Sequence, residues 1–170
     1  ESVLRAARGF MTTDTRPKLT GVTFGKTPEG GTYQMLGMAK GAAMIGPKLA
    51  TMLGLIITDA AITPDDAQRL LHQAADLTFN CVSVDGHMST NDTVLLLANG
   101  AAGEEPLAGK DLEAFESALK NAGDVLAHEI ADDGEGATHV IRIEVTGAES
   151  REDARKVARA VADSPLVKTA

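Results

Sequence analysis

The spacing of hydrophobic and polar residues predicts three helices in this chain of 170 residues. The first begins after Thr63, because a capping threonine, a proline in the first turn and two aspartates suit the positive end of a helix dipole. The second spans about 110–131, and the third begins at Ser150, which can form a capping box with Asp153. Apolar residues at helical spacing should turn each helix towards a core. They are Ala67, Leu70, Leu71, Ala74 and Ala75, then Leu112, Phe115, Leu119, Ala122 and Leu126, and finally Ala154, Val157, Ala158 and Val161.

Three further segments have the patterns of β-strands. Residues 51–58 and 93–101 are almost continuously apolar, as expected of strands that are covered on both faces. Residues 139–147 alternate apolar and polar side chains, which is typical of a strand with one buried face. Residues 25–33 form a turn-rich loop. Together these elements predict a mixed α/β (α+β) fold with mixed sheets and helices packed outside them.

The length and composition favour one soluble globular domain, residues 1–170, with a hydrophobic content of 44%. We expect no membrane partner, because no apolar run is long enough to span a bilayer, and no export leader is evident. The first residue is Glu1 rather than methionine, so we expect the chain to be a fragment of a longer precursor.

The charge balance argues against nucleic acid as a partner. Sixteen basic and 24 acidic residues give a net charge of −8, which would repel a phosphate backbone. The single Cys81 excludes an internal disulfide framework and suits a reducing compartment. We therefore expect the protein to be cytoplasmic.

Several patterns that resemble catalytic motifs have simpler explanations. Residues 21–27 lack the spacing of a phosphate-binding loop and are better interpreted as a surface turn. The four histidines have no paired ligand spacing, so we expect no metal site. Cys81 and His87 are a conceivable nucleophile and base, but a small buried thiol is the commoner outcome.

Three other features are ambiguous on local chemistry alone. The polar residues 89–92 suit a turn or cap before a strand, or the wall of a site at the end of that strand. Glu135, between two glycines, is either a solvated residue after a helix stop or a carboxylate presented on a tight loop. Thr51 is either an ordinary strand residue or a nucleophile. As a nucleophile it needs a base, and its own α-amine, with a pKa of about 8, could serve after a cut between Ala50 and Thr51.

Five blocks of sequence resemble the ornithine acetyltransferases, also called glutamate N-acetyltransferases or the ArgJ family of arginine biosynthesis. They occur in the family's order and cover nearly the whole chain. The blocks are "MTTDTRPK" (11–18), "GMAKGAAMIGPKLATML" (37–53), "STNDTVLLLANG" (89–100), "DGEGATH" (133–139) and "ARAVADSPLVKTA" (158–170).

This resemblance implies a self-processing enzyme with an N-terminal threonine nucleophile. Its fold would be of the DmpA/ArgJ type, N-terminal-nucleophile-like, with stacked mixed β-sheets flanked by helices. A precursor would cleave itself between Ala50 and Thr51, so that 1–50 end an α chain and 51–170 begin a β chain, with two of each chain in a heterotetramer. The enzyme would move an acetyl group from N-acetylornithine to glutamate without a cofactor, and acetyl-CoA is a possible further donor.

The resemblance also implies a set of site residues. Thr51 would be the nucleophile, and Thr12, Lys40 and Glu135 would contact substrate together with it. The sequence departs from the family's pattern at residues 47–49 and at His139, neither of which is a transferred site position.

Other parts of the family's site have no counterpart in these residues. The oxyanion-hole pair would precede the chain and the last substrate contacts would follow Ala170, so we expect these 170 residues alone to be inactive. Two alternatives stay open, an aminopeptidase or amidase of related fold and a non-catalytic relative that binds amino acids. An assay of glutamate-dependent acetyl transfer distinguishes the acetyltransferase from the aminopeptidase or amidase. Mass spectrometry for a break between Ala50 and Thr51 distinguishes it from the non-catalytic relative.

Overall fold

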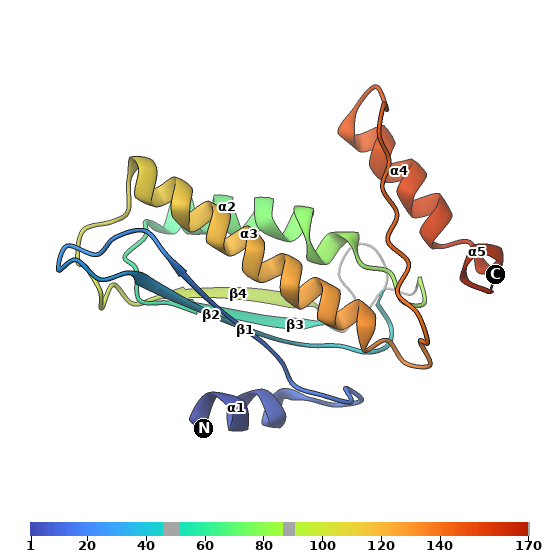
Figure 1. Ribbon diagram of the computed structural model, residues 1–170, viewed down its shortest axis with the longest axis horizontal. Helices are drawn as coiled ribbons and strands as arrows, with labels where there is room; N and C mark the ends of the chain where they lie inside the picture. The colour runs from blue at the N-terminus through green and yellow to red at the C-terminus, as the bar shows by residue number, and fades with distance from the viewer. Residues whose placement is uncertain (46–51, 87–90, 170) are drawn as a thin grey trace.

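A four-stranded mixed sheet organises the chain in the computed structural model, which describes residues 1–45, 52–86 and 91–169. The strands are β1 (Lys18–Phe24), β2 (Tyr33–Lys40), β3 (Leu53–Thr58) and β4 (Thr93–Ala98). They lie in the order β1-β2-β3-β4, with β1–β2 and β2–β3 antiparallel and β3–β4 parallel (Figure 1). The mixed α/β class expected from the sequence is confirmed. The described residues form one sheet, and the second sheet of a stack stays a prediction.

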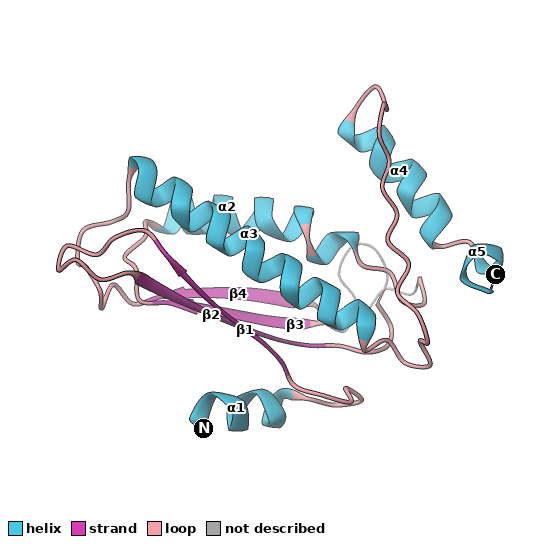
Figure 2. Cartoon of the chain, in the orientation of Figure 1, coloured by secondary structure: helices cyan, strands magenta, loops and turns pink. Residues whose placement is uncertain are grey.

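Helices lie on both sides of this sheet. The long helices α2 (Pro64–Leu77) and α3 (Gly109–Asp132) cover one face, and α1 (Ser2–Phe10) lies on the other side. A short 3-10 helix, Phe79–Cys81, follows α2. The helices α4 (Arg151–Ala162) and α5 (Pro165–Thr169) stand apart, at the end of a long irregular segment (Figure 2).

The three expected helices form, and side-chain caps begin two of them, α2 and α4. The Thr63 hydroxyl accepts a hydrogen bond from the Asp66 N–H at 3.2 Å, and the Ser150 hydroxyl accepts one from the Asp153 N–H at 3.1 Å. Each cap satisfies a donor that the first turn of a helix leaves without a partner. The caps therefore fix the starts of α2 and α4.

The core lies between the sheet and the two long helices. The buried side chains of α3 that pack against it include Phe115, Leu119, Ala122, Leu126 and Ile130. Gly37, in the middle of β2, permits this close approach, because a Cβ added there would lie 2.9 Å from a Leu126 methyl group. The expected apolar face of α3 is thereby confirmed.

The prediction of a β-strand at residues 139–147 is wrong. This segment is extended but irregular, and Ile141 is 52% exposed. An alternating pattern becomes a strand only where a neighbouring strand accepts its backbone hydrogen bonds. In Figure 2 the segment instead leads away from the sheet towards α4.

Three expectations about burial are also wrong. Strand β4 is not covered on both faces, since Leu95 and Leu97 are more than half exposed. No residue of α4 is buried, and Val157 is exposed, because this helix lies away from the core. Cys81 is exposed at the end of the 3-10 helix, whereas Phe79 takes the buried position of that turn.

Candidate functional site

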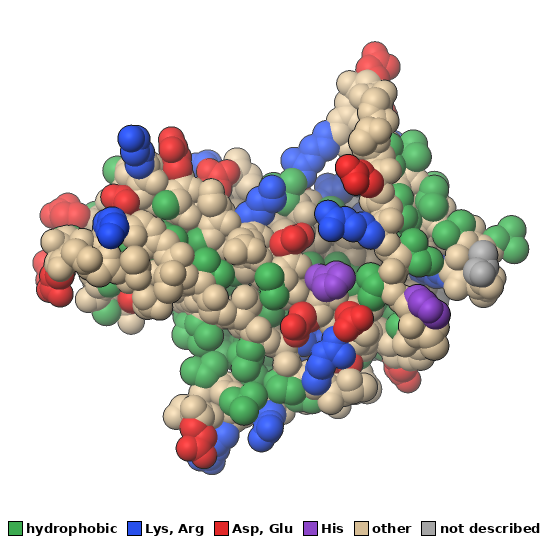
Figure 3. Space-filling model, viewed as in Figure 1, with side chains coloured by type: hydrophobic (Ala, Val, Ile, Leu, Met, Phe, Trp, Pro, Cys, Tyr) green, Lys and Arg blue, Asp and Glu red, His purple; other side chains and the backbone are tan. Residues whose placement is uncertain are grey.

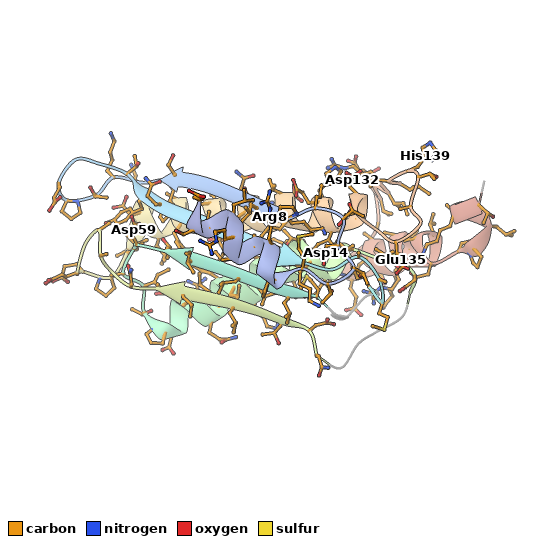
Figure 4. All side chains as sticks on the ribbon, turned by 90° about the horizontal axis from the view of Figure 1, so that it is seen from below. Arg8, Asp14, Asp59, Asp132, Glu135 and His139 are labelled. Atoms are coloured by element: carbon orange, nitrogen blue, oxygen red, sulfur yellow. The ribbon has the colours of Figure 1, made fainter. Side chains whose placement is uncertain are left out.

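One end of the sheet gathers most of the residues that the sequence singled out. Strand β1 begins there and β2 ends there, because the two are antiparallel and Lys18 pairs with Ala39. Strands β3 and β4 both begin at the same end, where Lys40 pairs with Leu53 and Leu53 with Thr93. We call this the site end. Figure 4 shows Asp14, Asp132 and Glu135 towards it, with Asp59 at the opposite end.

Lys40 and Thr12 meet at the site end. Lys40 is the last residue of β2 and is only 8% exposed. Its Nζ donates a hydrogen bond to the Thr12 hydroxyl oxygen at 3.2 Å, and Thr12 lies in the exposed loop between α1 and β1. A nearly buried ammonium beside an exposed hydroxyl can bind an anion such as a carboxylate. The structure thus brings these two predicted residues together.

Glu135 reaches the same region through its backbone. It follows the end of α3, and its N–H donates to the Ala42 carbonyl oxygen at 2.7 Å, two residues beyond Lys40. Its side chain is exposed. Glu135 also borders a cavity of about 320 Å³ whose wall includes His139 and Lys168. Neither Thr12 nor Lys40 lines that cavity, so it does not unite the predicted site residues.

Asp92 enters the site end from the residue before β4. Its Oδ1 accepts a hydrogen bond from the N–H of Met52, the residue that directly follows Thr51 in the sequence. Its Oδ2 is buried without a hydrogen-bond partner in the described part of the chain. Burial raises the pKa of the Asp92 carboxyl above its ordinary value, while the Met52 N–H and the positive charge of Lys40 oppose that shift. Asp92 links β3 and β4 across 40 residues.

A buried charge cluster of Lys18, Asp14 and Asp133 lies behind these residues. Lys18 Nζ donates to Asp14 Oδ1 at 2.6 Å and to Asp133 Oδ2 at 2.5 Å, and the side chains of all three are at most 2% exposed. Thr15 donates to Asp133 through both its hydroxyl and its N–H. One cation thus faces two carboxylates in the protein interior.

Hydrogen bonding keeps both carboxylates of the cluster ionised. For Asp14 the largest influence is burial, which opposes ionisation, but the Gly41 N–H, Lys18 and the Thr12 N–H together hold its pKa below the ordinary value. For Asp133 burial is again the largest influence, and the bonds from Lys18 and Thr15 outweigh it, so that its pKa is also lowered.

Ala50 and Thr51, the expected cleavage site and nucleophile, lie outside the described residues. Sequence reasoning missed Asp14, Lys18 and Asp133 as members of the site end, whereas Asp92 belongs to residues 89–92, for which the wall of a site was one of two interpretations. All four residues stand within the blocks that carried the resemblance. What the sequence lacked was a sign of burial, since lysine and aspartate are almost never buried without a partner.

The described residues contain neither a metal-binding cluster nor a membrane-spanning helix. Among them, no group of three or more His, Cys, Asp or Glu side chains could hold a metal ion. None of the helices in residues 1–45, 52–86 and 91–169 is both long and apolar enough to cross a membrane. Figure 3 shows instead that acidic and basic side chains gather around the end of α3.

The fold and the site end therefore define a mixed α/β protein whose polar residues converge on one edge of its sheet. The family model described as "ArgJ family" matches residues 1–170, and the chain belongs to this family. It is similar to the solved structure of the arginine biosynthesis bifunctional protein ArgJ from Bacillus halodurans. The identity is 44% and the TM-score 0.66, over 69% of this chain and 56% of the other.

Curated relatives give the same result at the level of sequence. The mitochondrial arginine biosynthesis bifunctional protein ArgJ of Uncinocarpus reesii is 47% identical over 98% of this chain. The corresponding protein of Chlorobium chlorochromatii is 48% identical over 99% of it. The chain spans 37% and 39% of the lengths of these two relatives.

Proposed function

We propose that the complete protein transfers an acetyl group from N-acetylornithine to glutamate in arginine biosynthesis, with Thr51 as nucleophile. The observation that carries this proposal is the contact of Lys40 Nζ with the Thr12 hydroxyl, 3.2 Å apart at the site end. The sequence places Thr51 just before Met52, whose N–H is held by Asp92 at the same end. Membership of the ArgJ family and the names of its relatives support the pathway.

The nucleophile must first be made by cleavage of the chain. The Thr51 hydroxyl attacks the Ala50 carbonyl, and the amide becomes an ester with release of the Thr51 α-amine. Water then hydrolyses the ester, which leaves Ala50 as a new C-terminus and Thr51 as a new N-terminus. The freed α-amine has an ordinary pKa of about 8, so part of it is unprotonated near neutral pH and can act as a base.

Transfer then proceeds in two halves. The α-amine takes the proton of the Thr51 hydroxyl, whose oxygen attacks the acetyl carbonyl of N-acetylornithine. The carbon–nitrogen bond breaks, the leaving nitrogen takes a proton, and ornithine departs from an acetyl-threonine ester. The α-amine of glutamate attacks this ester, the carbon–oxygen bond breaks, and Thr51 regains its proton as N-acetylglutamate leaves.

Two charged side chains would recognise the substrates. Both amino acids carry an α-carboxylate, which the Lys40 ammonium can pair with through a charge-assisted hydrogen bond beside the Thr12 hydroxyl. Glu135 would attract the side-chain ammonium of ornithine from the loop anchored at Ala42. Replacement of Lys40 by alanine should therefore raise the KM of both substrates.

The decisive test is Thr51→Ala in the complete protein. We expect an uncut chain by mass spectrometry and no acetyl transfer from N-acetylornithine to glutamate, because both steps use the Thr51 oxygen. Thr63→Ala is the control: it removes the α2 cap, at a cost of about 1 kcal/mol in stability, and should leave cleavage and transfer intact. A Thr51→Ala protein that is still cut before residue 51 would refute the proposal.

The relatives' names suggest a second donor. They are called bifunctional, and we propose acetyl-CoA as an alternative source of the acetyl group, to be tested by acetyl-CoA-dependent acetylation of glutamate. Cleavage of each precursor would give one α and one β chain, and we propose that two such pairs assemble as a heterotetramer. A cytoplasmic location stays a prediction, since the names of the fungal relatives place those proteins in mitochondria.

A further inference from the structure

We infer that the buried charge cluster of Lys18, Asp14 and Asp133 positions the substrate-binding residues rather than merely stabilising the fold. The cluster joins the three segments that carry Thr12, Lys40 and Glu135. This inference rests on the proposed function only for the identity of the substrates, N-acetylornithine and glutamate.

Asp14 is bonded to both segments that form the Lys40–Thr12 pair. Its Oδ2 accepts from the Thr12 N–H at 3.1 Å, and its Oδ1 accepts from the Gly41 N–H at 2.7 Å. Gly41 directly follows Lys40 and has a φ of 151°, a conformation that side chains other than hydrogen rarely adopt. One carboxylate therefore fixes the backbone on both sides of the 3.2 Å contact between Lys40 and Thr12.

Asp133 extends this arrangement to the loop of Glu135. It stands two residues before Glu135, where α3 ends, and it accepts hydrogen bonds from Thr15 and Lys18. The loop is held on its other side by the 2.7 Å bond from the Glu135 N–H to the Ala42 oxygen. The end of α3 is thus tied to the segment of Thr12 at one point and to the segment of Lys40 at another.

The chemistry of the cluster favours positioning over stability. Buried ion pairs are poor stabilisers, because desolvation offsets their attraction and apolar side chains of similar volume often do as well. Their hydrogen bonds, however, have fixed lengths and directions, whereas apolar contacts allow sliding. Catalytic groups must be held within a fraction of an ångström, and that need explains charges at this end of the sheet.

The test compares Asp14→Asn with Asp59→Asn in the complete protein. Asparagine offers one acceptor oxygen, so at position 14 either the Thr12 N–H or the donors from Lys18 and Gly41 lose their partner. Asp59 is a matched control, because its Oδ1 also accepts a backbone N–H, that of Gln34 at 2.8 Å, at the opposite end of the same sheet. Measurements are kcat and KM for each substrate, substrate binding by calorimetry, and thermal unfolding.

We expect Asp14→Asn to lower kcat/KM by roughly 10- to 100-fold, the effect of displacing a catalytic contact by about 1 Å. Asp59→Asn should change it less than about twofold. The double variant Asp14→Asn/Thr12→Ala should lose less transition-state binding free energy, measured from kcat/KM, than the two single variants added together. The reason is that Asp14 acts by positioning Thr12. Equal kcat/KM in the two asparagine variants, or full additivity in the double variant, overturns the inference.

A milder variant covers the case in which Asp14→Asn does not fold. Thr15→Val removes only the hydroxyl that donates to Asp133, and Thr15 is exposed. It should raise the KM of N-acetylornithine about threefold, the worth of one hydrogen bond, and lower the melting temperature by only a few degrees. An unchanged KM counts against the positioning role of Asp133.

The two proposals fail in different ways. Wild-type protein that binds both amino acids without transferring acetyl groups refutes the proposed function, and calorimetry of Asp14→Asn then decides the positioning role. Wild-type protein that binds neither refutes both. Normal transfer by wild type with an unaffected Asp14→Asn refutes positioning alone.

Discussion

The two ends of the sheet are held by different forces. At the end opposite the site, Phe24 stacks on Tyr33 with ring centroids 5.5 Å apart and meets the edge of Phe115 at 5.6 Å. At the site end, Lys18 is bonded to two buried carboxylates. Aromatic contacts bury area without strict geometry, whereas charged hydrogen bonds impose distances and directions. The comparison shows that buried apolar area stabilises one end of the sheet, whereas hydrogen bonds between charged groups fix the positions of residues at the other end.

The largest expected effect comes from Lys18→Met, which removes the cation of the cluster. Breaking a buried pair by removing one partner typically costs about 3–5 kcal/mol. Without Lys18, the pKa values of Asp14 and Asp133 should rise from their lowered values, so the loss is greatest at neutral pH and shrinks as the pH falls and both carboxylates become protonated. Denaturant unfolding at several pH values measures this, and a loss that is independent of pH would contradict it.

Phe24→Ala breaks the opposite end instead. It empties a buried aromatic position and should lower the free energy of unfolding by about 3 kcal/mol. The KM values for both substrates should stay at the wild-type level, because Phe24 takes part in none of the hydrogen bonds described at the site end. Denaturant unfolding and kinetics on the same preparation test this prediction, and a raised KM would mean that the two ends are coupled.

The smallest expected effect is that of Asp92→Asn. The folded pKa of Asp92 is raised, so its contribution to stability is present below the unfolded value of about 4 and is lost as pH rises through the folded pKa. Asparagine can still accept from the Met52 N–H and is never charged. The variant should therefore be slightly more stable than wild type at pH 7, with the gain vanishing near pH 4, as thermal unfolding at both values would show.

Helices α2, α3 and α4 were predictable because their signals are local, whereas α1 and α5 were not predicted. Thr63 and Pro64 mark the start of α2 within two residues, and the stripe from Leu112 to Leu126 needs only helical periodicity. The segment 139–147 shows the limit of that reasoning, since its alternation is local but its hydrogen bonding is not. Strands β1 and β2, although they frame the site end, were not predicted. The interpretation of residues 21–27 as a surface turn is wrong for 21–24, which pair with β2 as the end of β1.

The candidate site was predictable only in part, and for a similar reason. Thr12, Lys40 and Glu135 were found by resemblance, and their convergence depends on strand order, which no local pattern encodes. The burial of Lys18 depends on Asp133, 115 residues later in the chain. A lysine is usually a surface residue, so the sequence alone suggests that Lys18 is exposed. Only the folded chain reveals the two carboxylates, Asp14 and Asp133, that it neutralises.

The pairing of β2 with β3 has a consequence for a chain that is cut before Thr51. These strands are joined by a ladder of six residue pairs, from Met35 with Thr58 to Lys40 with Leu53. After cleavage the same ladder would become an intermolecular sheet, with its two strands contributed by separate polypeptides, as in a reconstituted split protein. The pieces should copurify under native conditions and part only in denaturant, so a native mass would conceal a cut that a denaturing gel reveals.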